Sequence, residues 1–199
     1  MGFICEGHYI IEPLVPQDAP KYIDLLLECM SETYDPLIAP GYGAKHRVNR
    51  EEMIERAAED FARPDARAFL SYDNPAWEPG VSLSCTVGGQ VDWDKPVGLV
   101  LSHCHVADWE HKEGIDDPPA GARKLSNLYT LARTHGTGLG SALFEAAIYP
   151  EEVAYAWVIA ENKHAISFYE RHGFQLEQPV FNALGLWSPA HSQRMSRGF

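Results

Sequence analysis

A glycine-rich segment at residues 135–140 has the most specific chemistry in the sequence. It reads His-Gly-Thr-Gly-Leu-Gly and lies between a strand-like run over 124–131 and a helical run over 139–149. Alternating glycines let the backbone turn tightly and expose its N–H groups, and the following helix has partial positive charge at its N-terminus. Both features favour an anion, so the segment predicts a phosphate-binding loop. The same glycines also fit a plain strand-to-helix turn, and the segment alone does not separate the two.

The glycine spacing excludes two familiar nucleotide-binding loops. The sequence has no Gly-x-x-x-x-Gly-Lys-Ser/Thr, which argues against a P-loop nucleotidase. Gly-x-Gly-x-Gly also differs from the Gly-x-Gly-x-x-Gly of dinucleotide-binding folds, and no acidic residue follows a second strand in the expected role. The phosphate-bearing ligand must therefore be identified from other residues.

A second group of residues, which could serve as metal ligands, contains three histidines and a cysteine. His103 and His105 lie two apart on a strand-like run, so their side chains share a face, and His111 follows in the next segment. Such a set predicts, as an alternative function, a zinc-dependent hydrolase. Cys104 points to the opposite face, and the sequence has neither His-Glu-x-x-His nor Cys-x-x-Cys. We therefore expect no metal, and hydrogen-bonded structural histidines are the alternative.

The composition limits the class of protein. With 199 residues, 45% of them hydrophobic, the chain is long enough for one sizeable core, so we expect a single domain over 1–199. A formal net charge of -12 argues against a nucleic-acid partner, because phosphate neutralisation needs clustered Lys and Arg. An acidic surface usually serves solubility, but it would also favour a cationic substrate.

The cellular compartment is predicted from what the chain lacks. No apolar run has the length of a membrane span, and the first residues lack the pattern of a signal peptide. The four cysteines show no Cys-x-x-Cys spacing, which favours reduced thiols over a disulfide framework. We therefore expect a cytoplasmic protein with no membrane partner.

Hydrophobic periodicity predicts the elements that must position these residues. An α+β domain is expected, with a mixed, mostly antiparallel sheet flanked by about four helices. Asn49 and Glu52 predict a capping box, while Asn162 predicts an N-cap and Gly173 a left-handed C-cap. Residues 107–123 predict an inserted, solvated loop. The helices are expected over 16–31, 49–63, 139–149 and 162–172, and the strands over 8–12, 66–72, 81–87, 97–106, 124–131 and 154–160, with at least one more after residue 180.

Three segments in the second half of the chain together identify a family. They are the loop at 135–140, the strand over 155–160 and the segment 162–174. The last segment follows the pattern Asn-x-x-Ala-x-x-Phe-Tyr-x-x-x-Gly-Phe with Asn162, Ala165, Phe168, Tyr169, Gly173 and Phe174. The three segments resemble the GNAT superfamily of N-acetyltransferases, whose acyl-CoA loop reads Arg/Gln-x-x-Gly-x-Gly/Ala. The clear resemblance covers residues 124–175 and implies a GNAT-like fold.

The glycine loop departs from the family pattern at one position. With Gly138 and Gly140 in the two glycine positions, His135 stands where the family has Arg or Gln. A second register would use Arg133 instead. The first register is preferred because it places the start of the helix as the family pattern does.

The resemblance implies that acetyl-CoA is the acyl donor and co-substrate. Leu128, Tyr129 and Thr130 would pair through their backbone with the pantetheine arm, as an added strand would. Asn162 would reach the pantetheine through its side chain. The pyrophosphate would be held by the loop and helix start, comprising His135, Gly136, Thr137, Gly138, Leu139, Gly140 and Ser141.

The implied reaction is direct transfer of an acetyl group from the thioester to a primary amine, either of a small molecule or of a peptide. Tyr169 would face the thioester sulfur and donate a proton to the CoA thiolate, since a phenol with a pKa of about 10 suits this role. Without the resemblance, Tyr169 would fit a core tyrosine with its hydroxyl at the edge.

Several features of the reaction stay open at the level of sequence. His103 and His105 are candidates for the general base, with a structural role as the alternative. Tyr34 and Asp35 match substrate-side positions by location only and fit an ordinary turn. A non-catalytic acyl-CoA-binding module on the same fold is a second hypothesis. The acceptor amine, the acyl preference and the choice between monomer and homodimer are also open.

Overall fold

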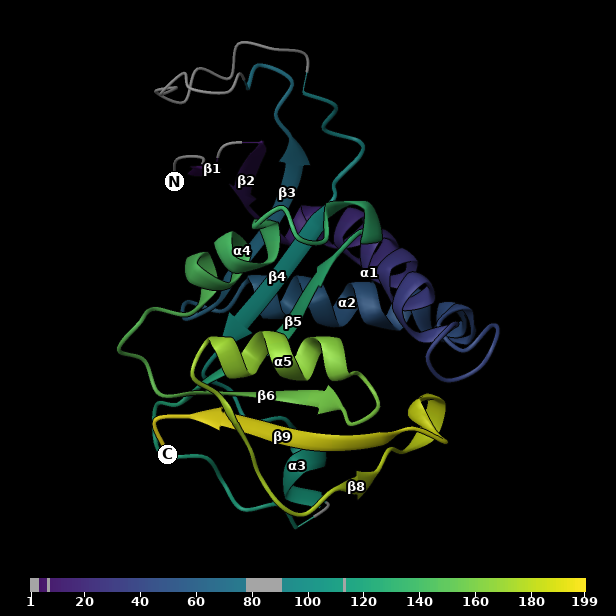
Figure 1. The fold of residues 1–199 in the computed structure, drawn as a ribbon, viewed down its shortest axis with the longest axis vertical. Coiled ribbons are helices and arrows are strands. Elements are labelled where there is room, and N and C mark those ends of the chain that lie inside the picture. Colours follow the sequence, from purple (N-terminus) through teal and green to yellow (C-terminus); the bar gives the residue numbers. More distant parts are fainter. Residues whose placement is uncertain (1–3, 7, 78–90, 113) are drawn as a thin grey trace.

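The computed structural model describes residues 4–6, 8–77, 91–112 and 114–199 (Figure 1). Within these residues, nine strands form one sheet in the order β1-β2-β3-β4-β5-β6-β9-β7, and β8 pairs with β9. All strand neighbours are antiparallel except β5 and β6, which are parallel. The predicted fold class, a mixed and mostly antiparallel sheet with flanking helices, is confirmed.

The strands and helices have the following bounds. The strands are β1 Ile4–Glu6, β2 Tyr9–Pro13, β3 Arg67–Asp73, β4 Gly98–His103, β5 Arg123–Thr130, β6 Ala154–Ile159, β7 Gln175–Leu176, β8 Phe181–Asn182 and β9 His191–Arg197. The helices are α1 Ala19–Tyr34, α2 Arg50–Phe61, α3 Asp108–Lys112, α4 Leu139–Ala147 and α5 Lys163–Arg171. In the part of the chain that the structure describes, none of these helices has the length and apolar content to cross a bilayer.

Two hydrophobic cores lie on opposite faces of the sheet. One joins α1 and α2 to the sheet through residues such as Leu27 and Leu99. The other joins α4 and α5 to the sheet through residues such as Leu143 and Val100. Because successive side chains of a strand point to opposite faces, the adjacent residues Leu99 and Val100 of β4 belong to different cores.

The N-terminal helices differ from the predictions at their ends. Helix α1 continues to Tyr34, beyond the predicted end at residue 31, and its last turn brings new side chains to the centre of the molecule. Asn49 does precede α2, but its side chain makes no capping hydrogen bond. The predicted capping box is therefore wrong, and Glu52 instead pairs with Arg56 one turn further along the helix.

Residues 107–123 are not simply a solvated loop. They contain α3, whose Glu110 is only 2% exposed. The Glu110 carboxylate accepts hydrogen bonds from Lys124 Nζ at 2.6 Å and Trp157 Nε1 at 2.9 Å. The Pro and Gly residues of the segment predict irregular structure, but they do not reveal a single glutamate that is buried by partners far along the chain. The strand predicted over 81–87 lies outside the described residues.

Strands β5 and β6 pair at one end only. Their register joins residues 123–125 to residues 154–156, and no pairing with β6 is described beyond Leu125. The register between β4 and β5 shifts between Leu101 and Ser102, opposite Ser126, and such a bulge bends a strand. We call residues 123–125 the paired segment of β5 and residues 126–130 its open segment.

Candidate active site between strands β5 and β6

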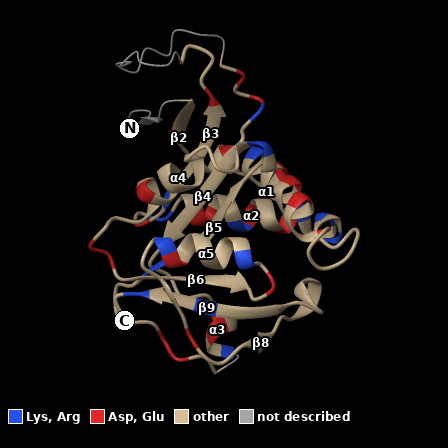
Figure 2. Ribbon diagram, viewed as in Figure 1, with Lys and Arg blue, Asp and Glu red and all other residues tan. Residues whose placement is uncertain are grey.

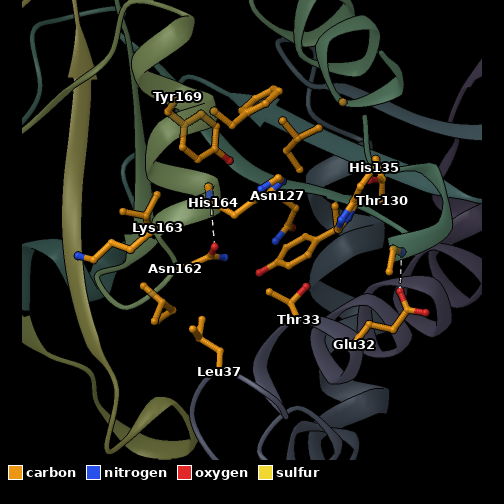
Figure 3. A pocket seen from close by; sticks show the side chains of 18 of the residues that line it. Glu32, Thr33, Leu37, Asn127, Thr130, His135, Asn162, Lys163, His164 and Tyr169 are labelled. Carbon is orange, nitrogen blue, oxygen red and sulfur yellow. Dashed lines mark hydrogen bonds between the residues drawn. The ribbon is translucent and has the colours of Figure 1, made fainter. Parts of the chain in front are cut away.

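A cavity of about 860 Å³ lies where β5 and β6 separate, and we call it the β5–β6 cavity (Figure 3). Its walls come from the open segment of β5, the glycine loop, the end of β6, the start of α5, and the end of α1 with the turn that follows. The volume lies within the range of small-molecule and cofactor sites.

The open segment of β5 supplies one wall with backbone hydrogen-bonding groups. It lies in the middle of the sheet, yet all five of its residues are partly exposed, because the pairing of β5 with β6 ends at Leu125. An extended ligand could add to this edge as a strand does. Leu128, Tyr129 and Thr130 all line the cavity.

The glycine loop supplies a second wall. Gly136 and Gly138 have φ values of +77° and +93°, a left-handed conformation that L side chains rarely adopt. Gly138 is also the N-cap of α4, so the first N–H groups of that helix follow it directly. The arrangement suits an anion at the N-terminus of α4.

The loop residues do not all face the cavity. His135, Gly136, Gly138, Gly140 and Ser141 line it. Thr137 turns its side chain away, and its hydroxyl donates to the carbonyl oxygen of Thr134 at 2.7 Å and accepts from the Tyr9 hydroxyl at 3.0 Å. Leu139 is only 1% exposed and belongs to the core. The side chains of Thr137 and Leu139 are therefore structural.

The two registers of the loop place different side chains at the cavity. Arg133 is absent from the lining and forms an ion pair with Asp73 at 2.7 Å. His135 does line the cavity, and its ring stacks on that of His164, with ring centroids 5.3 Å apart. The geometry therefore favours the register with His135.

Helix α5 begins and ends as the sequence predicts. Asn162 Oδ1 accepts a hydrogen bond from the Ala165 N–H at 3.0 Å, and Gly173 has a φ of +85°. Asn162 also lines the cavity, so the same side chain both caps the helix and faces the space left by β6 (Figure 3).

Three tyrosines gather at the inner part of the cavity. The hydroxyls of Tyr34 and Tyr129 lie 3.0 Å apart. Tyr169 is 8% exposed and points its hydroxyl toward the middle of the cavity (Figure 3), where no hydrogen-bond partner is described for it. Burial raises the pKa of all three phenols, so each remains protonated at neutral pH and is able to donate a hydrogen bond.

His103 is the last residue of β4 and His105 follows the strand, which ends before the predicted residue 106, and both candidate bases lie outside the cavity. His103 Nδ1 accepts the His105 backbone N–H at 3.2 Å, and its Nε2 lies 2.8 Å from Ser126 Oγ. Since Nδ1 is an acceptor, Nε2 holds the proton and donates to the hydroxyl. Burial, together with the charge of Lys124, lowers the pKa of His103 to about 4. His103 therefore supports Ser126 from behind, and His105 does not line the cavity either.

Of the remaining candidates from the sequence, Asp35 and His111 make contacts within the protein away from the cavity. Asp35 Oδ1 accepts the Gly43 N–H at 2.6 Å, which is a turn contact, whereas Tyr34 lines the cavity. His111 lies 3.0 Å from Asp117. Among the described residues, no group of three or more His, Cys, Asp or Glu side chains could hold a metal ion.

Sequence reasoning missed several residues of the cavity wall. Asn127 directly precedes the assigned Leu128 on β5, and Lys163 and His164 directly follow Asn162, so their positions beside the motifs were an available signal. Glu32 and Thr33 had no such signal, because they reach the cavity only through the extra turn of α1. Glu32 fixes that turn by accepting the Ala132 N–H at 2.8 Å.

Comparisons with known proteins agree with this geometry. Residues 92–176 match the model of the acetyltransferase (GNAT) domain. An uncharacterised N-acetyltransferase of Methanocaldococcus jannaschii is 31% identical over 102 residues, which cover 48% of this chain and 39% of that protein. The chain thus spans well under half the length of this curated relative.

Solved structures share the fold over nearly the whole chain. The PaiA N-acetyltransferase of Thermoplasma acidophilum, in complex with coenzyme A, has a TM-score of 0.59 at 14% identity and covers 96% of this chain and 99% of its own. A GNAT-family acetyltransferase of Streptococcus pneumoniae has a TM-score of 0.59 at 18% identity, covering 95% and 98%. The chain thus shares the fold of these acetyltransferase structures. Over residues 92–176 the chain is similar to the GNAT superfamily, and the acyl donor of that family is acetyl-CoA.

Proposed function

We propose that the protein is an N-acetyltransferase that transfers an acetyl group from acetyl-CoA to a primary amine by direct attack. The observation that carries the proposal is the meeting of three features at one cavity. These are the open segment of β5, the N-terminus of α4 behind Gly138, and the unpartnered hydroxyl of Tyr169.

In the proposed complex, each wall of the β5–β6 cavity holds a different part of acetyl-CoA. The backbone of residues 128–130 pairs with the pantetheine arm, because none of the described strands pairs with that edge of β5. The loop from His135 to Ser141 holds the pyrophosphate through backbone N–H groups at the start of α4. The Asn162 amide oxygen caps the helix, and its side chain also hydrogen-bonds to Tyr34, so one N–H of the NH₂ group remains to donate to the pantetheine.

The proposed reaction forms a C–N bond and breaks the C–S bond. The neutral amine attacks the thioester carbon, and N–H donors of the cavity stabilise the oxyanion of the tetrahedral intermediate. As the intermediate collapses, Tyr169 donates its proton to the departing thiolate, and the proton released by the attacking nitrogen restores the phenol, directly or through water. Burial raises the pKa of Tyr169, and it raises the pKa of a thiolate at the same place for the same reason, so the proton transfer remains matched.

A cytoplasmic location and a small-molecule or peptide amine as acceptor are part of the proposal. Cys29 and Cys104 are free thiols, as expected for a reducing compartment. His103 and His105 have no role in this proposal, because neither lines the cavity.

Acetyl-CoA binding and turnover test the proposal directly. At 100 times its dissociation constant, acetyl-CoA should stabilise the protein by about 2.7 kcal/mol in a thermal or urea unfolding experiment. Free thiol should then be released when an amine is added. Stabilisation without release for any amine would favour an acyl-CoA-binding module, and the absence of both would overturn the proposal.

Tyr169→Phe tests the proton donor. We expect turnover to fall about 100-fold or more, the range for loss of a general acid, while acetyl-CoA affinity changes by less than about twofold. Tyr149→Phe is the control, because Tyr149 is exposed and does not line the cavity. Wild-type turnover in Tyr169→Phe would remove the tyrosine from the mechanism.

A further inference from the structure

A second cavity of about 390 Å³ lies between α1, α2 and the sheet, and we call it the α1–α2 cavity. We propose that it holds the acceptor and selects a primary amine that carries a second positive charge, such as a diamine. The inference rests on the proposed acetyl transfer and names the class of its acceptor.

The α1–α2 cavity shares wall residues with the site proposed for acetyl-CoA. Asn127 and Tyr129 line both cavities. They lie two apart on the open segment of β5, so both side chains point to the face covered by α1 and α2. An amine that enters along this face would thus reach the acyl group beside Tyr129. The volume suits a small molecule.

The charged residues of the α1–α2 cavity leave a net negative charge. Its charged side chains are Glu52, Arg56 and Asp60. Glu52 and Arg56 form an ion pair and neutralise each other. Asp60 has no hydrogen bond or ion pair described, and Figure 2 shows further acidic residues on both helices that cover the cavity.

Two of the positive groups near Asp60 are engaged elsewhere. Burial raises the pKa of Asp60, and the charges of Arg63, His105 and Lys124 only partly oppose this. Lys124 is bonded to Glu110 at 2.6 Å, and Arg63 lies 3.7 Å from Asp65. An ammonium group in the cavity would give the half-buried carboxylate the direct partner that it lacks.

An imidazole in the same wall is also suited to a cation. His46 is 4% exposed, lines the α1–α2 cavity, and has its Nε2 buried with no hydrogen-bond partner in the described structure. Burial and the charge of Lys45 lower its pKa to about 4, so the ring is neutral at neutral pH and does not repel an ammonium group. The ring lies 4.5 Å from that of Trp187, whose aromatic face attracts a cation.

A matched set of four-carbon acceptors tests the proposal. The set comprises the linear diamine, the monoamine butylamine, and the amino acid with a carboxylate in place of the second amine. In a thiol-release assay, kcat/KM for the diamine should exceed that for butylamine by at least about tenfold, the factor expected for one charged hydrogen bond. The amino acid should be the poorest acceptor. Equal values for diamine and butylamine, or a preference for the amino acid, would overturn the proposal.

Asp60→Asn tests the residue that sets the preference. We expect kcat/KM for the diamine to fall by at least about tenfold, so that the diamine loses its advantage over butylamine. Glu59→Gln is the matched control, because Glu59 is exposed on the same helix and does not line the cavity. An undiminished diamine preference in Asp60→Asn would remove the carboxylate from recognition and overturn the proposal.

Acetyl-CoA binding separates failure of this inference from failure of the proposed function. If acetyl-CoA neither stabilises the protein nor is consumed with any amine, the proposed function is wrong. If acetyl-CoA is consumed with butylamine as readily as with the diamine, only the inference is wrong. If acetyl-CoA binds but none of the three acceptors reacts, calorimetry of the CoA complex decides, and a diamine that does not bind overturns the inference.

Discussion

The two segments of β5 use polar side chains in opposite ways. In the paired segment, Arg123 donates to the Asp65 carbonyl oxygen at 2.8 Å, and Lys124 to Glu110 at 2.6 Å. In the open segment, Tyr129 and Asn127 face cavities, and no strand in the described part of the chain pairs with the backbone edge next to β6. One strand thus contains groups that hold the fold together and, a few residues later, groups that are left for ligands.

The difference arises from where β6 lies and not from the residue types. The paired segment contains two cations that would be costly to bury alone, and each has its partners inside the protein. The open segment follows the bulge at Ser126, after which β6 no longer covers the edge. Changes in the paired segment should therefore affect stability, and changes around the open segment should affect binding and turnover.

The largest effect is expected from removing Glu110, the partner of Lys124 in the paired segment. Glu110→Ala leaves the Lys124 ammonium buried and unpaired, which should lower the free energy of unfolding by about 3–5 kcal/mol. Urea unfolding measures this loss. Acetyl-CoA affinity of the folded variant should change by less than about threefold. Asp108→Ala, an exposed residue of the same short helix, is the control. A loss of affinity larger than the loss of stability would contradict the division between the two segments.

The second largest effect is expected from a substitution in the glycine loop, which faces the open segment across the β5–β6 cavity. Gly138→Val forces a branched side chain into a left-handed conformation at the N-cap of α4, which should distort the phosphate site. Acetyl-CoA affinity should fall by at least about tenfold, the effect of losing one charged hydrogen bond, as measured by calorimetry.

Gly121→Val is the matched control for Gly138→Val. Gly121 has a similar φ of +82°, with open space around it and no place in the β5–β6 cavity. Both variants should lose comparable stability, but only Gly138→Val should lose affinity. Equal affinities in the two variants would show that the loop does not hold the cofactor.

The sequence predicted the walls of the β5–β6 cavity better than it predicted the contacts of the paired segment. Asn162, Gly138 and the β5 strand were found because their roles follow from local patterns, namely a helix cap, a glycine turn and an apolar run. Glu110 was missed because its partners, Lys124 and Trp157, lie 14 and 47 residues away. No local periodicity records such a contact.

The α1–α2 cavity could not be predicted from the sequence for a related reason. The α1–α2 cavity is lined by residues of several elements, among them α1, α2, β5 and the segment before β9. The pattern within any one element predicts only whether a residue is buried or exposed. Asp60 is one acidic residue among several on α2, and only the folded chain places it in a cavity wall. Sequence alone thus predicts the cofactor of the family and leaves the acceptor open.

A smaller effect separates the two roles of Asn162. Asn162→Ala removes the N-cap and should cost about 1 kcal/mol of stability, whereas Asn162→Ser keeps a capping oxygen and should cost only a few tenths. Neither variant retains the amide NH₂, so both should bind acetyl-CoA more weakly than the wild type. Wild-type affinity in Asn162→Ser would reduce Asn162 to a helix cap, a result that calorimetry and urea unfolding together would reveal.

The smallest effect at neutral pH is expected from His103, which supports the open segment from behind. His103→Gln loses one hydrogen bond to Ser126 and should cost about 1 kcal/mol. The pKa of His103 is lowered to about 4 from the usual 6.5, so in this window the folded state binds fewer protons than the unfolded state. The stability that His103 contributes is therefore complete above pH 6.5 and is lost as the pH falls toward 4.

The stability of the wild type should decrease over this pH window more steeply than that of His103→Gln. His46 has a pKa lowered to about 4 as well and contributes with the same sign, so the variant should keep part of the slope. Urea unfolding at several pH values measures both slopes, and His111→Gln, at an exposed histidine, is the control. The pH profile of turnover should not change in His103→Gln, because the imidazole does not reach the β5–β6 cavity. A shifted turnover profile with an unchanged stability slope would return His103 to the list of candidate bases.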